Sequence, residues 1–117
     1  MKESRRTQKV SSMIKRKLGD ILIRETGQYR DMGFVTITDV TITKDLGTAH
    51  VYFSVIGGKM KRDKQIHVLE KMGKHLRHLL ASAVILKYIP RIRMIYDETP
   101  AKAQKIETIL KKIEDGI

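Results

Sequence analysis

The sequence predicts a single α+β domain in which helices cover a three-stranded mixed sheet, in the order αββααβ followed by a terminal helix. Three observations predict this class. Two β-branched segments are joined by a tight turn, a long amphipathic helical stretch contains a glycine, and a third extended segment follows a proline. With 117 residues, 41% of them hydrophobic, the chain can build one modest core. We therefore expect residues 1–117 to form one domain.

The first predicted helix begins after a cap at Ser4 or Thr7 and continues to about Thr26, where Gly27 follows as a C-terminal glycine. The short N-terminus before it, residues 1–6, is basic. Apolar side chains at helical spacing form its buried stripe: Val10, Met13, Ile14, Leu18, Ile21 and Leu22. The opposite face carries three cations, Arg5, Lys9 and Arg16. These cations are either a solvated face or a contact with RNA.

Two strands are predicted next, over residues 34–43 and 48–56, because both segments are rich in β-branched residues. In the first strand, Val35 and Ile37 share a face, whereas Val40 and Ile42 are one residue out of phase. This slip predicts a bulge or bend at Asp39. The short turn at residues 44–47 makes the two strands an antiparallel pair.

A helix–kink–helix is predicted over residues 63–88, with the kink at Met72 and Gly73. Glycine inside a helix costs about 1 kcal/mol relative to alanine, so Gly73 indicates a bend or a close backbone approach. One face is apolar and is expected to pack on the sheet: Ile66, Leu69, Met72, Leu76, Leu79, Leu80 and Ala83. The opposite face is expected to form an exposed basic edge: His67, Lys71, Lys74 and His78.

Pro90 ends the helical region, and residues 91–97 read as a third strand with Ile92, Met94 and Tyr96 on one side. If the helices carry the chain past the hairpin, this strand lies parallel to the first one. Thr99 and Pro100 resemble the start of a terminal helix over about residues 100–114. Its apolar positions are Ile106, Ile109, Leu110 and Ile113.

The net charge of +11 is concentrated in two segments. Residues 1–30 hold nine basic and three acidic side chains, and residues 59–93 hold ten basic and two acidic ones. The other two stretches are slightly acidic. Such clustering predicts a surface that binds a polyanion, with nucleic acid favoured over a generic positive charge.

The predicted order of elements is that of a type II KH domain. KH domains that bind nucleic acid usually carry a Gly-x-x-Gly loop between their two central helices, which clamps the backbone of the nucleic acid. This sequence has Gly73 alone at that place. We therefore expect a KH-like domain with a helix kink in place of the loop.

The amino-acid sequence of the predicted strands, together with this order of elements, resembles the bacterial ribosome-binding factor A family over most of the chain. The segments that carry the resemblance are Val35-Thr36-Ile37-Thr38-Asp39-Val40, Lys44-Asp45-Leu46, Ala49-His50-Val51-Tyr52-Phe53-Ser54, Leu76-Arg77 and Pro90-Arg91-Ile92-Arg93-Met94 with Asp97. The family's Ala-x-Gly kink is not matched. The corresponding triplet is Lys71-Met72-Gly73 or Met72-Gly73-Lys74, depending on the register.

The resemblance implies a bacterial, cytoplasmic maturation factor that binds the free small (30S) ribosomal subunit and assists late processing and folding of 16S rRNA, notably in the cold. It implies no enzyme activity, no cofactor and no small-molecule substrate, and we expect a monomer. The alternative is a generic KH-like protein that binds RNA or DNA without specificity for the ribosome.

Our hypothesis is that basic side chains along the helix edge contact RNA phosphates, which positions a protein more than it reads sequence. With aromatic residues at 5%, base stacking is not favoured, and recognition of shape and backbone is expected instead. The candidate RNA-binding residues are Lys71, Lys74, Arg77, Lys64, Lys59, Lys61, Arg62, Arg5, Lys9, Arg16, Arg91 and Arg93.

The sequence disfavours two further functions, a metal-dependent enzyme and a membrane-surface protein. His75 and His78 lie three residues apart, a possible metal spacing, but the chain has no cysteine and no carboxylate at a fitting distance in sequence, so we predict no metal site and no catalytic residue. The first helix could lie on an anionic membrane. Its apolar stripe lacks Trp and Phe, and is better suited to covering a sheet.

Overall fold

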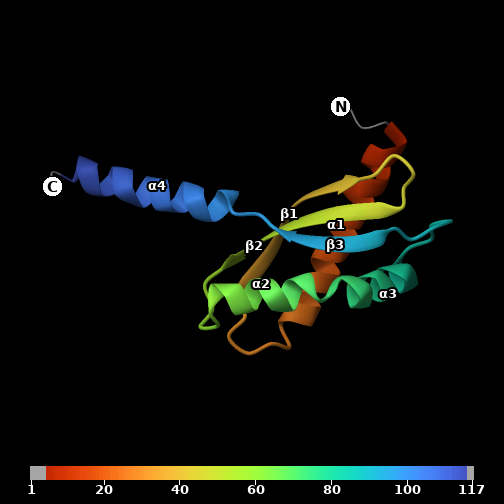
Figure 1. Ribbon diagram of the computed structural model, residues 1–117, viewed down its shortest axis with the longest axis horizontal. Coiled ribbons are helices and arrows are strands. Elements are labelled where there is room, and N and C mark those ends of the chain that lie inside the picture. The colour runs from red at the N-terminus through yellow and green to blue at the C-terminus, as the bar shows by residue number, and fades with distance from the viewer. Residues whose placement is uncertain (1–4, 116–117) are drawn as a thin grey trace.

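A computed structural model describes residues 5–115 of the chain. The predicted order of elements is confirmed (Figure 1). The elements are α1 (Arg5–Thr26), β1 (Phe34–Ile42), β2 (Thr48–Ile56), α2 (Arg62–Glu70), α3 (Gly73–Ala83), β3 (Arg91–Tyr96) and α4 (Thr99–Glu114). Thr7 lies inside α1 and therefore does not cap it, and the other predicted cap, Ser4, is outside the described residues.

The three strands form one mixed sheet in the order β1-β2-β3. β1 pairs with β2 antiparallel, as predicted, whereas β3 pairs with β2 in parallel. β3 therefore runs opposite to β1, and the expectation that these two strands are parallel is wrong. The reason is that α2 and α3 return the chain to the starting end of β2 and place β3 on its free edge, which is the common connection between neighbouring parallel strands.

The predicted bulge in β1 is confirmed. Ile37 pairs with Phe53 and Asp39 pairs with Tyr52, so the register shifts between Ile37 and Asp39. The Asp39 side chain accepts a hydrogen bond from the backbone N–H of Val40 at 2.9 Å. Because of this extra residue, the apolar side chains before and after the bulge point to the same face.

One face of the sheet is covered by α1, α2 and α3, and the core lies between them (Figure 1). The fully buried centre of the core includes Phe53 and Val51 of β2, Leu18 of α1 and Leu76 of α3. Ile92 and Met94 of β3 face the same core, as the alternation in this strand predicted. Among residues 5–115, no helix is long and apolar enough to cross a membrane.

The helix pair is kinked at Lys71 and Met72, between the end of α2 and the start of α3. A Cβ atom on Gly73 would lie 2.5 Å from the carbonyl oxygen of Ile92, so this position requires glycine for a close approach to β3. The second helix ends at Ala83 rather than at Tyr88, because Val84 adopts an extended conformation with φ −134° and ψ 156°. Ala83 is consequently exposed instead of buried.

The connections at one end of the sheet are held together by Gln65. Its amide, 1% exposed, donates hydrogen bonds to the carbonyl oxygens of Met32 (2.7 Å) and Gly57 (3.0 Å). Its side-chain oxygen accepts a hydrogen bond from Arg62 at 2.9 Å, and the same Nη1 of Arg62 donates to the carbonyl oxygen of Val55 at 2.7 Å. Arg62 therefore fastens the start of α2 to the end of β2.

α4 extends away from the sheet and the other helices as a separate arm (Figure 1). Its predicted apolar stripe is exposed over at least half of each side chain: Ile106, Ile109, Leu110 and Ile113. The radius of gyration, 16.4 Å, exceeds the value of about 13 Å for a compact chain of this length because of this arm.

Candidate nucleic-acid interface

The kink, α3 and the start of β3 together form a basic hollow of about 720 Å³. The side chains of four cations line it: Lys71, Lys74, Arg77 and Arg91. Gly73 and Ile92 form its floor, and Glu70 is the one carboxylate in its lining. Four of the twelve predicted RNA-binding residues are thus brought to one place, which we call the kink hollow.

The close contact between Gly73 and Ile92 explains why these cations gather. Because glycine has no side chain, the N-terminal end of α3 reaches the backbone of β3. Lys74 and Arg77, one turn apart on α3, then lie beside Arg91, the first residue of β3. A larger residue at position 73 would push these two elements apart and open the kink hollow.

The N-terminus of α3 adds positive potential to the same place. α3 begins at Gly73 without a side-chain cap and without an acidic residue in its first turn. The N-terminal end of a helix carries a partial positive charge, which favours anions such as phosphate. The kink hollow therefore combines the charges of four side chains with the dipole of a helix backbone.

Arg77 also has a structural role. Its Nε and Nη2 atoms donate hydrogen bonds to the carbonyl oxygen of Ile89 at 3.3 and 2.9 Å. These bonds hold the segment before β3 against α3, so the guanidinium is fixed at the rim of the kink hollow.

Of the other eight predicted residues, Arg62 is hydrogen-bonded to Val55 and Gln65 at the start of α2, and seven lie at three separate places. Lys59, Lys61 and Lys64 are exposed around the start of α2, on a ridge that leads along the helix toward Lys71. Arg93 is exposed on β3 but does not line the kink hollow. The three α1 cations are exposed, and one of them, Arg16, lines a different groove, between α1 and β1.

A second hollow, of about 510 Å³, lies on the other side of the kink, between α2, α3 and the end of α1. Lys71 lines both hollows. Six of its eight lining residues were not among the predicted site residues, and three of these six come from the end of α1 and the turn after it: Glu25, Gln28 and Tyr29. Their placement depends on how α1 packs on the helix pair, which no local sequence pattern reveals.

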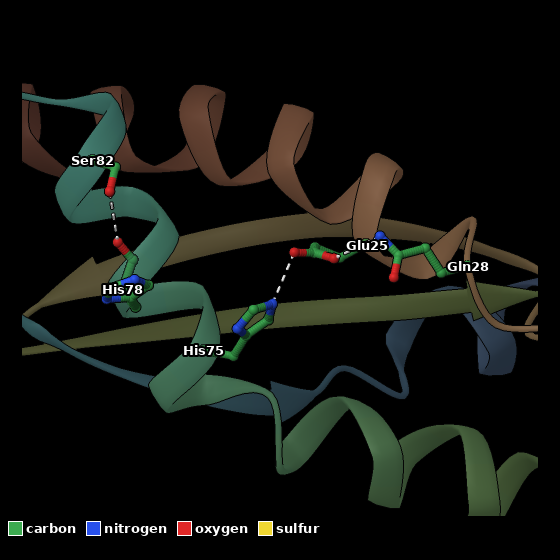
Figure 2. A network of polar contacts seen from close by, with 5 residues as sticks. All are labelled: Glu25, Gln28, His75, His78 and Ser82. Carbon is green, nitrogen blue, oxygen red and sulfur yellow. Dashed lines mark hydrogen bonds and ion pairs between the residues drawn. The ribbon is translucent and has the colours of Figure 1, made fainter.

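Figure 2 shows the contact that joins α1 to α3 at this hollow. The imidazole of His75 points at Glu25, with 2.8 Å between Nε2 and Oε1, and the Gln28 amide donates to the other carboxylate oxygen at 3.2 Å. His78 lies on the same helix, where its carbonyl oxygen accepts a bond from Ser82. His75 thus contacts a carboxylate across the helices, and within residues 5–115 there is no group of three or more His, Cys, Asp or Glu that could hold a metal ion.

Comparison with known proteins gives one consistent result. The sequence profile of the ribosome-binding factor A family matches residues 6–110. Ribosome-binding factor A of Halothermothrix orenii is 32% identical over 110 residues, a match that covers 94% of this chain and 89% of that protein.

Solved structures agree in fold. The crystal structure of ribosome-binding factor A from Thermus thermophilus matches with a TM-score of 0.61 at 20% identity, covering 77% of this chain and 94% of that one. A homology model of the Thermus thermophilus factor, fitted into the cryo-EM map of its complex with the 30S subunit, matches with a TM-score of 0.57, also at 20% identity, over 75% and 91% of the two chains. The length and strength of the sequence match place this chain in the ribosome-binding factor A family.

Proposed function

We propose that this protein binds the small (30S) ribosomal subunit through the kink hollow and assists the late maturation of its 16S rRNA. The observation that carries the proposal is the convergence of Lys71, Lys74, Arg77 and Arg91 in one hollow of a protein of this family. The Thermus thermophilus relative was placed in the map of a 30S complex. The action is binding without a catalytic step, in the cytoplasm where free subunits mature.

Phosphates are the part of the RNA that this surface suits best. The lysine and arginine side chains that line the kink hollow can reach phosphate oxygens. Such contacts fix the position of a protein on RNA but carry little information about sequence. The N-terminus of α3 adds backbone N–H donors for the same oxygens. The kink hollow therefore anchors the protein on the ribose–phosphate backbone.

We assign the remaining cations two supporting roles. Lys59, Lys61 and Lys64 extend the contact along α2 to neighbouring phosphates. Arg5, Lys9, Arg16, Arg62 and Arg93 raise the positive potential around the contact, which accelerates the encounter with RNA.

The experiment that tests the proposal compares two double charge reversals with the same net charge. Lys71→Glu with Lys74→Glu alters the kink hollow, and Lys111→Glu with Lys112→Glu alters two exposed lysines of α4. In sucrose gradients, we expect the wild type and the α4 variant to sediment with free 30S subunits, and the kink variant to remain at the top. Each lost phosphate contact should reduce the log–log salt slope of RNA binding by about 0.7 to 0.9.

Equal weakening by both double variants would show that net charge, and not the kink hollow, determines binding. Equal affinity of the wild type for 30S subunits and for random duplex RNA would favour the generic KH-like alternative. The maturation role is tested separately, because depletion of the protein should cause precursor 16S rRNA to accumulate, most strongly at low temperature. Complementation by the kink variant would contradict the proposal.

A further inference from the structure

The loop of residues 84–90, between α3 and β3, is fixed at both ends and projects in the middle. Val84 donates its backbone N–H to the carbonyl oxygen of Leu80 at 3.1 Å, and Arg77 holds the carbonyl oxygen of Ile89 by two hydrogen bonds. Val84 and Ile89 also pack against the core. Figure 1 shows the loop extending beyond the adjacent ends of α3 and β3.

The middle of this loop carries the two most exposed large hydrophobic side chains of residues 5–115. Ile85 is 101% exposed and Tyr88 is 72% exposed. By contrast, the rings of Phe53 and Tyr96 contact each other, with 5.8 Å between their centroids. Tyr88 therefore presents an aromatic ring to solvent on a loop whose base is fixed.

A cation accompanies the exposed ring. The Nζ atom of Lys87 lies 5.5 Å from the centroid of the Tyr88 ring, within the range of a cation–π interaction. Surfaces that bind single-stranded nucleic acid combine these two groups, because a cation attracts the phosphate and an aromatic ring stacks on the base. The loop holds one of each side by side.

The loop also adjoins the kink hollow. Tyr88 directly precedes Ile89, whose carbonyl oxygen contacts Arg77 at the rim of the hollow. From Lys71 to Tyr96 the chain has six Lys or Arg residues and no carboxylate. A phosphate chain in the kink hollow would therefore pass beside the Tyr88 ring.

One turn on the other side of this loop contributes opposite charges. The Gly47 carbonyl oxygen accepts a hydrogen bond from the Arg91 N–H at 2.9 Å, so the turn between β1 and β2 lies beside the start of β3. This turn carries one exposed cation and one exposed carboxylate, Lys44 and Asp45. It leaves the excess of positive charge around the loop unchanged.

We propose that Tyr88 stacks on one unpaired base of the RNA whose phosphates lie in the kink hollow. This inference rests on the proposed function and adds the form of the RNA, which is a backbone with an unpaired nucleotide beside the bound phosphates. Bases of this kind are the ones that aromatic side chains can reach. With 5% aromatic residues the chain cannot build a platform of several rings, but a single base requires a single ring.

The test uses two fluorescein-labelled RNA duplexes that differ at one bulged nucleotide, which is adenosine in the first and an abasic ribose in the second. Both carry the same phosphates, so a difference in affinity measures the contribution of the base. We expect the wild type to bind the adenosine bulge at least about fivefold more tightly in fluorescence anisotropy. Tyr88→Ala should lose this preference and keep its affinity for the abasic duplex, whereas Tyr88→Phe should retain the preference.

Tryptophan fluorescence locates the contact, because the chain contains no tryptophan. In Tyr88→Trp, we expect the adenosine bulge to quench the emission more strongly than the abasic duplex does. Phe34→Trp is the matched control, since Phe34 is 61% exposed on β1, at the other edge of the sheet. Its emission should respond equally weakly to both duplexes.

The kink variant, Lys71→Glu with Lys74→Glu, separates this inference from the proposed function. It should weaken binding of both duplexes by the same factor and keep the preference for the adenosine bulge. Unchanged binding by the kink variant would overturn the proposed function and this inference together. Weaker binding by the kink variant, with equal affinity of the wild type for both duplexes, would overturn this inference alone.

Two results from the tryptophan variants would also overturn it. The first is equal quenching by the adenosine bulge in Tyr88→Trp and in Phe34→Trp, which would mean that the base has no specific place on the protein. The second is a change in the Tyr88→Trp emission with vesicles of phosphatidylserine and phosphatidylcholine but not with RNA, which would assign the loop to a lipid surface.

Discussion

The surfaces beside the two edges of the sheet differ in this protein. At β3, the neighbouring α3 approaches so closely that only glycine fits at position 73, and cations surround the contact. At β1, Gly19 of α1 lines a groove between the helix and the strand, and a Cβ atom added there would have no atom within 4 Å. The space around the helix glycine therefore differs between the two edges.

The two edges also differ in charge. Four cations and one carboxylate line the hollow at β3, a composition that suits a chain of phosphates. The groove at β1 is lined by Lys15 and Arg16 with the carboxylate of Asp20, and by apolar side chains such as those of Ile23 and Phe34.

The largest expected effect comes from closing the space at the β3 edge. Gly73→Ala places a methyl group 2.5 Å from the Ile92 carbonyl oxygen, so α3 must move away from β3. We expect a loss of about 2 to 3 kcal/mol in the free energy of unfolding, as for an overpacked core position, measured by urea denaturation. Binding to 30S subunits should fall as well, because Lys74 and Arg77 move with α3.

The matched substitution at the other edge should have the opposite sign. Gly19→Ala meets no atom within 4 Å and replaces glycine in the interior of α1. Alanine should raise the free energy of unfolding by about 0.5 to 1 kcal/mol through its higher helix propensity. Destabilisation by both substitutions would contradict the contrast between the crowded Gly73 and the uncrowded Gly19.

A smaller effect on stability should distinguish Arg62, which has a structural role, from its exposed neighbours. Arg62→Ala removes the hydrogen bonds to Val55 and Gln65, both part-buried, and leaves the two acceptors without this donor, which should cost about 1 kcal/mol in urea denaturation. Its exposed neighbour Lys61 provides the matched control, because Lys61→Ala should leave stability unchanged within about 0.5 kcal/mol. Equal stability of the two variants would show that the hydrogen bonds of Arg62 do not stabilise the fold.

Much of this architecture could be predicted from local patterns. The phase slip around Asp39 predicted the bulge, and the position of Gly73 predicted a close approach of the backbone. Which edge of the hairpin receives β3 could not be predicted, because the alternation of Ile92 and Met94 identifies a buried face and not a neighbour. The end of α3 was also placed too late, since the apolar run after Ala83 is compatible with both helix and extended chain.

Local patterns likewise predicted some residues of the candidate sites and not others. Helical spacing predicted that Lys71 and Lys74 share an exposed stripe, and the structure adds Arg91 through the packing of α3 on β3. The pair formed by Glu25 and His75 joins residues fifty positions apart and leaves no signal in either segment. The groove between α1 and β1 was not predicted, because Gly19, which lines it, looks like any other position in the first helix.

The smallest effect concerns the link between the two edges. Asp97, directly after β3, accepts a hydrogen bond from the Thr38 hydroxyl of β1 at 2.7 Å and one from the Thr99 N–H at 3.0 Å. The Thr38 bond, and then the Thr99 bonds, lower the pKa of the Asp97 carboxyl below its model-peptide value of 3.8. A carboxyl whose pKa is lower in the folded state stabilises the fold above its unfolded pKa, and this contribution is lost as the pH falls through the folded value.

Asp97→Asn should therefore be slightly less stable than the wild type at neutral pH, by under about 0.5 kcal/mol because the group is solvent-screened. The difference should shrink as the pH falls through the lowered pKa of Asp97, because both chains then carry an uncharged side chain at position 97. Urea denaturation of both chains from pH 7 down to pH 2.5 measures this difference in the free energy of unfolding. The pKa of Asp45 is also lowered, mainly by the hydrogen bond from the Thr43 hydroxyl, but both chains contain Asp45 and its effect cancels in the difference. Thr38→Val, which lacks the donor, should reduce the same pH-dependent term. A difference that persists unchanged at pH 2.5 would mean that Asp97 joins the two edges through its shape and not through its charge.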